Sequence, residues 1–382
     1  MIKVLFVENN LPDRILISSR IPDYCIVINV DSITDVLPLI ANTETDILIL
    51  GPSIDEDCRR LLTEARAAGK PERIIIFSRE TVSAVADCES GTCSDVEYIN
   101  LPHGFDLFQK IFYEIFKNRL NEIMTSSTYR LNKKMSALIG SSHQISDVKD
   151  RIIKFAPAPG PVLITGESGT GKDIVARLLH ELSDRSDSVF HPLNAATIAK
   201  ELAAVELFGS DPGAYTGARS RHGCFEYSDG GTLFLDEIAE LDMQIQAELL
   251  RTLESGLVQR VGGNKKIAVD VRLIAATNCN LATAVNEGRF RSDLLYRIDM
   301  FRIHLAPLRA RKEDIPDLLM HFSEQLRLER PNRHWEFSDS FLDKLFDYDW
   351  PGNIRELRNV FRRAVYTADS TILTAESVRF DY

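Results

Sequence analysis

The chain has 382 residues, a net charge of −11 and 44% apolar residues. This length predicts two or three domains, and the composition is typical of a soluble globular protein. Apolar runs are too short to span a membrane, and the opening MIKVLFVENN is typical of a β-strand rather than of a signal peptide. An acidic chain without an evident basic patch argues against DNA binding, which depends on lysine and arginine contacts to phosphates. These features predict a cytoplasmic protein.

Six cysteines are scattered along the chain without a Cys-x-x-Cys pair, which indicates a reducing compartment. Cys88 and Cys93, with His103 further on, could be read as metal ligands. The spacing of zinc sites and a fourth ligand are missing, so free thiols in a loop are the preferred interpretation.

Residues 1–120 alternate helical stretches with the apolar segments KVLFV, CIVINV, DILIL, RIIIF and VEYINL. This alternation is typical of a doubly wound α/β domain, in which helices cover a parallel sheet. Residues 104–135 carry apolar pairs at helical spacing, which predicts a long amphipathic helix. Its apolar stripe either packs on its own domain or mediates self-association, and residues 121–137 are interpreted as a helical linker.

Residues 138–305 contain three further strand segments, GPVLITG, GTLFLDE and VRLIAATN, which predict a second α/β domain. Strand patterns are absent from residue 306 onward. The apolar spacing in EDIPDLLMHFSEQL, DSFLDKLFDYDW and NIRELRNVFRRAVYTA is helical, and it predicts a helical lid over residues 306–382.

The segment VLITGESGTGKD places a Gly-x-x-x-x-Gly-Lys pattern between an apolar strand and a helical stretch. This context suits a phosphate-binding loop, because the glycines turn backbone N–H groups toward phosphate oxygens and the helix N-terminus favours negative charge. Asp173 stands where a serine or threonine usually contacts Mg²⁺. The candidate ATP-binding residues are Gly166, Glu167, Ser168, Gly169, Thr170, Gly171, Lys172 and Asp173.

Asp236 and Glu237 end the strand segment GTLFLDE. An acid at a strand end can hold Mg²⁺ through water, and its neighbour can polarise the attacking water. Strand ends also carry acids for solvation alone, but the position downstream of a phosphate loop favours catalysis. Asn278 ends VRLIAATN, and in a parallel sheet its amide is expected near the γ-phosphate.

Three arginines are further candidates for a role in ATP hydrolysis. Arg291 and Arg297, six residues apart, could act as arginine fingers on a neighbouring subunit, although arginines on a helix surface are the plainer reading. Arg355, in the lid, could contact the nucleotide of its own chain.

Together these motifs resemble the ATPase domain of bacterial enhancer-binding proteins, the AAA+ activators of sigma-54 RNA polymerase. The resemblance covers residues 138–369, where GESGTGKD, ELFGSDPGAYTGA, GTLFLDE, LLRTLESGLVQRVGG, AATN, FRSDLLYRI, PLRARKEDIP and WPGNIREL occur in the family's order. It implies an oligomer, from a dimer to a hexameric or heptameric ring, that uses ATP and Mg²⁺ to remodel the sigma-54 RNA polymerase closed complex. The family accepts an acid at the position of Asp173.

The resemblance also implies roles for individual residues. Asn194 matches the residue that restrains the catalytic glutamate, with Glu206 as a candidate relay beside it, Asn278 matches sensor I and Arg355 matches sensor II. The implied catalytic residues are Asp236, which also binds Mg²⁺ through water, Glu237, Asn194, Asn278, Arg291 and Arg297.

The segment GAYTGA resembles the family's signature loop, which contacts sigma-54. Tyr215 stands where phenylalanine is usual, so the aromatic ring is kept and gains a hydroxyl, and the required Thr216 is present. A plain glycine turn would not explain six positions in register. The candidate sigma-54 contacts are Gly213, Ala214, Tyr215, Thr216, Gly217 and Ala218.

The first domain resembles a response-regulator receiver whose chemistry is degenerate. Glu8 is the single acid after the first strand, Gly51 stands where the phosphate-accepting aspartate belongs, and Leu101 replaces the lysine, while Ser78 fits the hydroxyl position. This implies a pseudoreceiver, regulated by dimerisation, a partner or a small ligand rather than by aspartyl phosphate.

Family members usually end in a helix-turn-helix, and the last segment, AVYTADSTILTAESVRFDY, is too short for one. Either the chain is part of a longer protein, or it activates polymerase from solution or through a DNA-bound or signalling partner, without sequence-specific DNA contacts of its own. Two alternatives to a sigma-54 activator remain: a non-catalytic regulator that co-oligomerises with an active homologue, and an AAA+ remodeller of another protein.

Overall fold

The structure is a computed structural model of the chain. It describes residues 2–18, 20–22, 25–30, 32, 36, 38–40, 45–52, 73–78, 96–101, 108, 110, 127–214, 220–329, 335–368 and 370–380. The chain divides into two compact units. The first unit comprises Met1–Lys133, Leu319–Lys344 and Arg363–Tyr382, and the second comprises Lys134–Leu318 and Leu345–Arg362. The domain boundaries expected near residues 120, 137 and 305 remain predictions.

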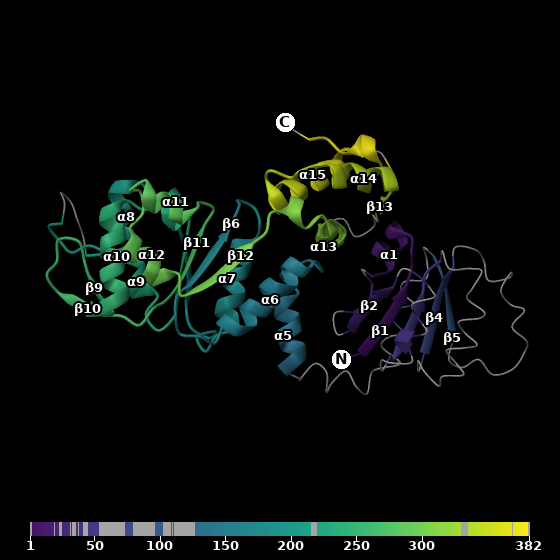
Figure 1. Ribbon diagram of the computed structural model, residues 1–382, viewed down its shortest axis with the longest axis horizontal. Coiled ribbons are helices and arrows are strands. Elements are labelled where there is room, and N and C mark those ends of the chain that lie inside the picture. Colours follow the sequence, from purple (N-terminus) through teal and green to yellow (C-terminus); the bar gives the residue numbers. More distant parts are fainter. Residues whose placement is uncertain are drawn as a thin grey trace, which may run out of the picture. The chain divides into compact units, whose positions relative to one another are not determined.

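A five-stranded parallel sheet forms the centre of the first unit (Figure 1). Its order, β2-β1-β3-β4-β5, is that of the flavodoxin-like doubly wound fold. The strands are β1 (Ile2–Val7), β2 (Cys25–Val30), β3 (Ile47–Leu50), β4 (Arg73–Ser78) and β5 (Val96–Asn100), and helix α1 (Leu11–Ser18) follows β1.

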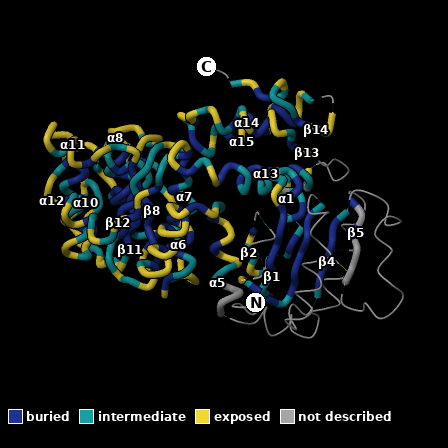
Figure 2. The backbone as a smooth tube through the Cα atoms, turned by 45° about the vertical axis from the view of Figure 1, so that its right-hand side comes forward, coloured by how far each residue is buried: buried dark blue, intermediate teal, exposed yellow. Residues whose placement is uncertain are grey.

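Both faces of this sheet are buried. Phe6 lies in one apolar cluster with Ile17 of α1 and Phe108, whereas the adjacent Val7 lies in a second cluster with Ile40. Successive strand residues point to opposite faces, so continuous apolar strands require cover on both sides. Figure 2 shows β1 as a mostly buried strand. The predicted doubly wound α/β fold is confirmed.

The second unit contains another five-stranded parallel sheet, in the order β12-β6-β11-β8-β7. Its strands are β6 (Val162–Gly166), β7 (Phe190–Asn194), β8 (Thr232–Asp236), β11 (Arg272–Thr277) and β12 (Phe301–Leu305). The sequence predicted β6, β8 and β11 but not the two edge strands. FHPLN and FRIHL mix polar with apolar residues, and a proline such as Pro192 is tolerated in an edge strand.

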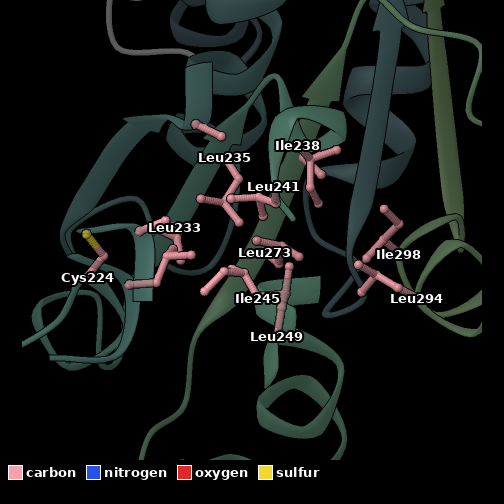
Figure 3. Close-up of a cluster of buried hydrophobic side chains, with 14 of the residues drawn as sticks. Cys224, Leu233, Leu235, Ile238, Leu241, Ile245, Leu249, Leu273, Leu294 and Ile298 are labelled. Atoms are coloured by element: carbon pink, nitrogen blue, oxygen red, sulfur yellow. The ribbon is translucent and has the colours of Figure 1, made fainter. Parts of the chain in front are cut away.

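Helices cover both faces of the second sheet. Helices α6 (His143–Phe155) and α7 (Lys172–Glu181) pack on one face. On the other face, α10 (Met243–Ser255) and α12 (Ser292–Ile298) bury leucines and isoleucines against β8 and β11 (Figure 3). A hairpin follows α10, with strands β9 (Leu257–Gln259) and β10 (Lys266–Ala268). The helices are α5 (Ser127–Met135), α6 (His143–Phe155), α7 (Lys172–Glu181), α8 (Lys200–Phe208), α9 (Cys224–Tyr227), α10 (Met243–Ser255), α11 (Leu281–Asn286) and α12 (Ser292–Ile298).

The predicted lid helices are present as α13 (Ile315–Glu329), α14 (Asp339–Asp347) and α15 (Asn353–Thr367). The expectation that strands are absent after residue 306 was wrong in one detail. Two short strands, β13 (Glu336–Phe337) and β14 (Ile372–Leu373), pair in parallel, and segments of two residues are too short to produce a periodic pattern. None of the helices in the described part of the chain has the length and apolar character needed to cross a bilayer.

Two expectations fall largely outside the described residues. Of the predicted helix over residues 104–135, residues 108 and 110 and the last part, α5, are described. The choice between packing and self-association therefore stays open. Cys88, Cys93 and His103 also lie outside, and within the described ranges no group of three or more histidines, cysteines or acids is arranged to hold a metal ion.

Candidate functional site

The carboxyl ends of three parallel strands bring the candidate catalytic residues together. Strand β6 leads into the phosphate loop, β8 ends at Asp236, and β11 is followed by Asn278. Strand β11 lies between β6 and β8, so Asn278 is placed between the phosphate loop and the acidic pair. Ligands of open α/β sheets bind at this edge.

The phosphate loop has the backbone that an anion site requires. Gly169 and Gly171 adopt φ angles of 79° and 101°, a left-handed conformation that glycine reaches without strain. Gly171 is the N-cap of α7 and supplies no side-chain cap. The first turn of α7 therefore presents its N–H groups and the positive end of the helix dipole to a phosphate, which fits ATP.

Lys172 connects the loop with the acidic pair. Its ammonium group donates to the carbonyl oxygen of Gly166 at 3.0 Å and lies 3.4 Å from Glu237 Oε1. The side chain is largely buried, with 8% of its surface exposed. The ammonium group in this position can exchange its contact with Glu237 for a contact with an incoming phosphate group.

Glu237 is held in a strained conformation. Its φ of 53° is left-handed, which costs a non-glycine residue about 1–3 kcal/mol and is typical of functional sites. Its second oxygen, Oε2, accepts the backbone N–H of Asn278 at 3.0 Å. The two carboxylate oxygens therefore contact the phosphate-loop lysine and the backbone that follows β11.

Asp236 has the properties of a magnesium ligand. Burial, reinforced by the charge of Glu237, raises the pKa of its carboxyl group. A cation relieves this unfavourable concentration of negative charge, and Mg²⁺ is commonly bound by one or two carboxylates together with substrate phosphates. The residues present therefore fit Mg²⁺ at Asp236.

Asn194 contacts the first acid of the pair rather than the second. Its Nδ2 donates to Asp236 Oδ2 at 3.1 Å, and its Oδ1 accepts the N–H of Ala196 at 2.9 Å. Glu206 forms a bidentate ion pair with Arg221, at 2.8 and 2.9 Å, and its role as a relay stays a prediction. The proposed restraint of Glu237 by Asn194 stays a prediction.

The two candidate arginine fingers are held within their own chain. Arg291 forms a bidentate pair with Asp293 at 3.0 and 2.7 Å, and Arg297 donates to the carbonyl oxygen of Leu253 at 2.8 Å. Both lie at α12, where the intervening Tyr296 is 84% exposed. This arrangement places them on an exposed helix, and their action on a neighbouring subunit stays a prediction.

Arg355 lies at the phosphate loop. Its guanidinium donates to the hydroxyl of Ser168 at 3.1 Å. Sequence reasoning missed two residues beside it: Asn353, which donates to Glu167 and to the Ser168 carbonyl oxygen, and Arg309, which pairs with Glu167. The segment WPGN beside Arg355 was the available signal, but neither its glycine nor its asparagine specifies a partner.

Hydrogen bonds and ion pairs hold the stem of the GAYTGA loop. Ser210 and Arg221 exchange backbone hydrogen bonds, and Arg260 forms ion pairs with Glu226 at 2.6 Å and Asp211 at 3.2 Å. The hydrogen bond from Arg260 lowers the pKa of Glu226. Sequence reasoning did not identify this cluster. The loop tip, which includes Tyr215, Thr216, Gly217 and Ala218, lies outside the described residues.

The receiver-like sheet carries the four expected positions at its carboxyl edge: Glu8, Gly51, Ser78 and Leu101 follow or end β1, β3, β4 and β5. Glu8 is completely buried, and a Cβ atom at Gly51 would lie 2.0 Å from its Oε2. The glutamate side chain thus fills the space that an acceptor side chain at position 51 would need.

Comparisons with known proteins show which families and relatives the chain resembles. A family model of the Sigma-54 interaction domain matches residues 138–304, and one of the AAA+ ATPase lid domain matches residues 309–382. The chain is 44% identical over 241 residues to nitrogen fixation protein AnfA of Azotobacter vinelandii, covering 63% of this chain and 45% of AnfA. It is 47% identical over 242 residues to transcriptional regulatory protein ZraR of Salmonella typhimurium, covering 63% of this chain and 54% of ZraR. The chain thus spans about half the length of these relatives.

Crystal structures of NtrX from Brucella abortus match nearly the whole chain. The complex with ADP has a TM-score of 0.59 at 28% identity, over 99% of this chain and 86% of that one. The complex with ATP has a TM-score of 0.58 at 28% identity, over 99% and 87%.

Proposed function

We propose that this chain is a sigma-54-dependent transcription activator. The proposal follows from the two family matches, the Sigma-54 interaction domain over residues 138–304 and the AAA+ ATPase lid domain over residues 309–382. The protein would act as an oligomeric ATPase that remodels the sigma-54 RNA polymerase closed complex, in the cytoplasm where the polymerase works. The observation that carries this proposal is the convergence of Lys172, the acidic pair and Asn278 at one sheet edge.

The chain's own residues supply most of the chemistry. Lys172 neutralises phosphate charge, while Glu237 orients and deprotonates the attacking water, and Asn278 fixes that glutamate through its backbone N–H. Arg355 contacts the nucleotide from the lid side of the loop, and Arg291 with Arg297 would act on a neighbouring subunit. Mg²⁺ bound through Asp236 would neutralise charge on the phosphate oxygens. The complexes of NtrX with ADP and ATP support nucleotide binding by this fold.

The GAYTGA loop is the proposed contact with sigma-54. Its stem is anchored by ion pairs and backbone hydrogen bonds within the second unit. Thr216 and the ring of Tyr215 would make the contact. Regulation would come from the receiver-like domain through dimerisation, a partner or a small ligand, because Gly51 has no oxygen to phosphorylate.

Phosphate release by purified protein tests the ATPase. We expect Lys172→Ala to lose nucleotide binding, and Glu237→Gln to keep binding while hydrolysis falls about 10²–10⁴-fold, the usual contribution of a positioned base. Glu240→Gln, a change to an acid in the same segment, serves as the matched control and should retain activity. A non-catalytic regulator, the alternative function, would show no turnover in the wild type.

Binding to sigma-54 in the presence of a transition-state nucleotide analogue tests the target. Thr216→Ala should lose this binding and keep ATP hydrolysis, whereas Tyr215→Phe should keep or improve it. Normal ATPase activity without any sigma-54 binding would contradict the proposal and would favour a remodeller of another protein.

A further inference from the structure

We propose that Glu167, Arg309 and Asn353 form a latch that holds the WPGN turn, residues 350–353, against the phosphate loop and thereby positions Arg355 on the nucleotide. This loop latch rests on the proposed ATPase function. It assigns a positioning role to Arg309 and Asn353, and to the side chain of Glu167 in the phosphate loop. It explains how a residue of the lid sequence reaches a loop that precedes it by almost two hundred residues.

The first component is the carboxylate of Glu167. Arg309 approaches it through two nitrogens, Nη1 at 2.9 Å from Oε2 and Nη2 at 2.5 Å from Oε1. Asn353 Nδ2 donates to the same Oε2 at 3.2 Å. A bidentate arginine pair fixes direction as well as distance, so the carboxylate has a defined orientation between two partners.

The second component is the side chain of Asn353, which is completely buried. Its Nδ2 also donates to the carbonyl oxygen of Ser168 at 3.1 Å, and its Oδ1 accepts the N–H of Leu308 at 2.8 Å. The amide therefore joins the phosphate loop to the segment that carries Arg309. A buried polar group bonded at both ends is costly to displace, because its partners would remain unsatisfied.

Backbone contacts close the same junction. Ile354 donates its N–H to the Gly169 carbonyl oxygen at 3.0 Å, and a Cβ atom at Gly169 would lie 2.4 Å from the Gly352 oxygen. Trp350 and Asn353 both adopt a φ of 53°. Such strained residues persist when surrounding contacts over-determine them, as the latch does here.

The ion pair contributes orientation more than stability. Hydrogen bonds from Arg309 and then from Asn353 lower the pKa of Glu167 to about 2, so the carboxylate is ionised at neutral pH. The side chains of Arg309 and Glu167 are 44% and 41% exposed, and solvent screens such pairs strongly. Breaking the Arg309–Glu167 pair should therefore change the position of Arg355, two residues after Asn353, more than it changes the stability of the protein.

The test is a double-mutant cycle on nucleotide preference. Dissociation constants for ADP and for a non-hydrolysable ATP analogue are measured for the wild type, Glu167→Gln, Arg355→Ala and the double variant. Glu167→Gln should reduce the preference for the ATP analogue over ADP by about 3- to 30-fold, within the range of coupled neighbouring residues. In the Arg355→Ala background the same substitution should change this preference little, because the positioned group is already absent.

Two further variants test whether the change in nucleotide preference comes from the Arg309–Glu167 pair. Arg309→Gln should reproduce the effect of Glu167→Gln from the exposed side of the pair, and it replaces that variant if it does not fold. Asp270→Asn, which removes the partner of Arg185 in another surface ion pair, is the matched control and should leave the preference unchanged.

The results distinguish a failure of the latch from a failure of the proposed ATPase function. Equal losses of preference with and without Arg355 would overturn the latch, as would an unchanged preference in both Glu167→Gln and Arg309→Gln. A wild type that binds neither nucleotide would contradict the proposed ATPase function instead.

Discussion

Gly169→Ala tests the packing of the WPGN turn on the phosphate loop directly. Gly169 has a φ of 79°, and its Cβ would lie 2.4 Å from the backbone oxygen of Gly352. Gly288→Ala is a matched control, because Gly288 has a φ of 71° but, among the described residues, nothing lies within 4 Å of its Cβ position. Both substitutions introduce left-handed strain, and only one introduces a collision.

The magnitudes follow from this difference. Left-handed strain costs roughly 1–2 kcal/mol at either position. At Gly169 the Cβ is also about 1 Å short of ordinary contact with backbone, and overpacking of this kind adds roughly 1–3 kcal/mol. One kcal/mol corresponds to about 2–4 °C in Tm for a unit of this size. We expect Gly288→Ala to lower Tm by about 2–8 °C and Gly169→Ala by clearly more.

Thermal unfolding without nucleotide is the suitable assay, since Gly169 also faces the phosphates in the proposed complex. If the turn moves aside to relieve the collision, the loss of Tm will be smaller but the loop will gain protease sensitivity near Gly352. Equal Tm losses in the two variants, with unchanged proteolysis, would show that the turn is not packed on the loop.

The remaining predictions concern the receiver-like site, the core and the thiols. Gly51→Asp should not accept phosphate from acetyl phosphate, because Glu8 fills the required space, and should lower Tm; a phosphoprotein detected by mass spectrometry would contradict this. Leu249→Ala should lower the free energy of unfolding in urea by about 2–5 kcal/mol, because the side chain is completely buried. Burial raises the pKa of Cys224 to about 11, so iodoacetamide should label the half-buried Cys279 first; equal labelling of both peptides would refute this reasoning.

Local sequence patterns were sufficient for the fold class and for most of the candidate nucleotide site. Strands β1, β3 and β4 are buried on both faces, so their apolar runs identify a covered parallel sheet. The phosphate loop could also be predicted from the sequence, because the left-handed backbone at Gly169 and Gly171 requires glycine whatever the surrounding structure. The edge strands β7 and β12 were not predicted, because a half-exposed strand does not carry a continuous apolar pattern.

The sequence by itself determined which residues can bind phosphate, hold a metal or bear a charge, because these properties belong to single residues and short segments. The tertiary structure decided their partners. It placed Asn278 beside Glu237, turned Asn194 toward Asp236, and joined Arg309 to Glu167 across 142 residues. Strand order and packing between distant segments create such pairs, and no local spacing encodes them. WPGNIREL was therefore visible as a motif of the family, whereas its contact with the phosphate loop was not.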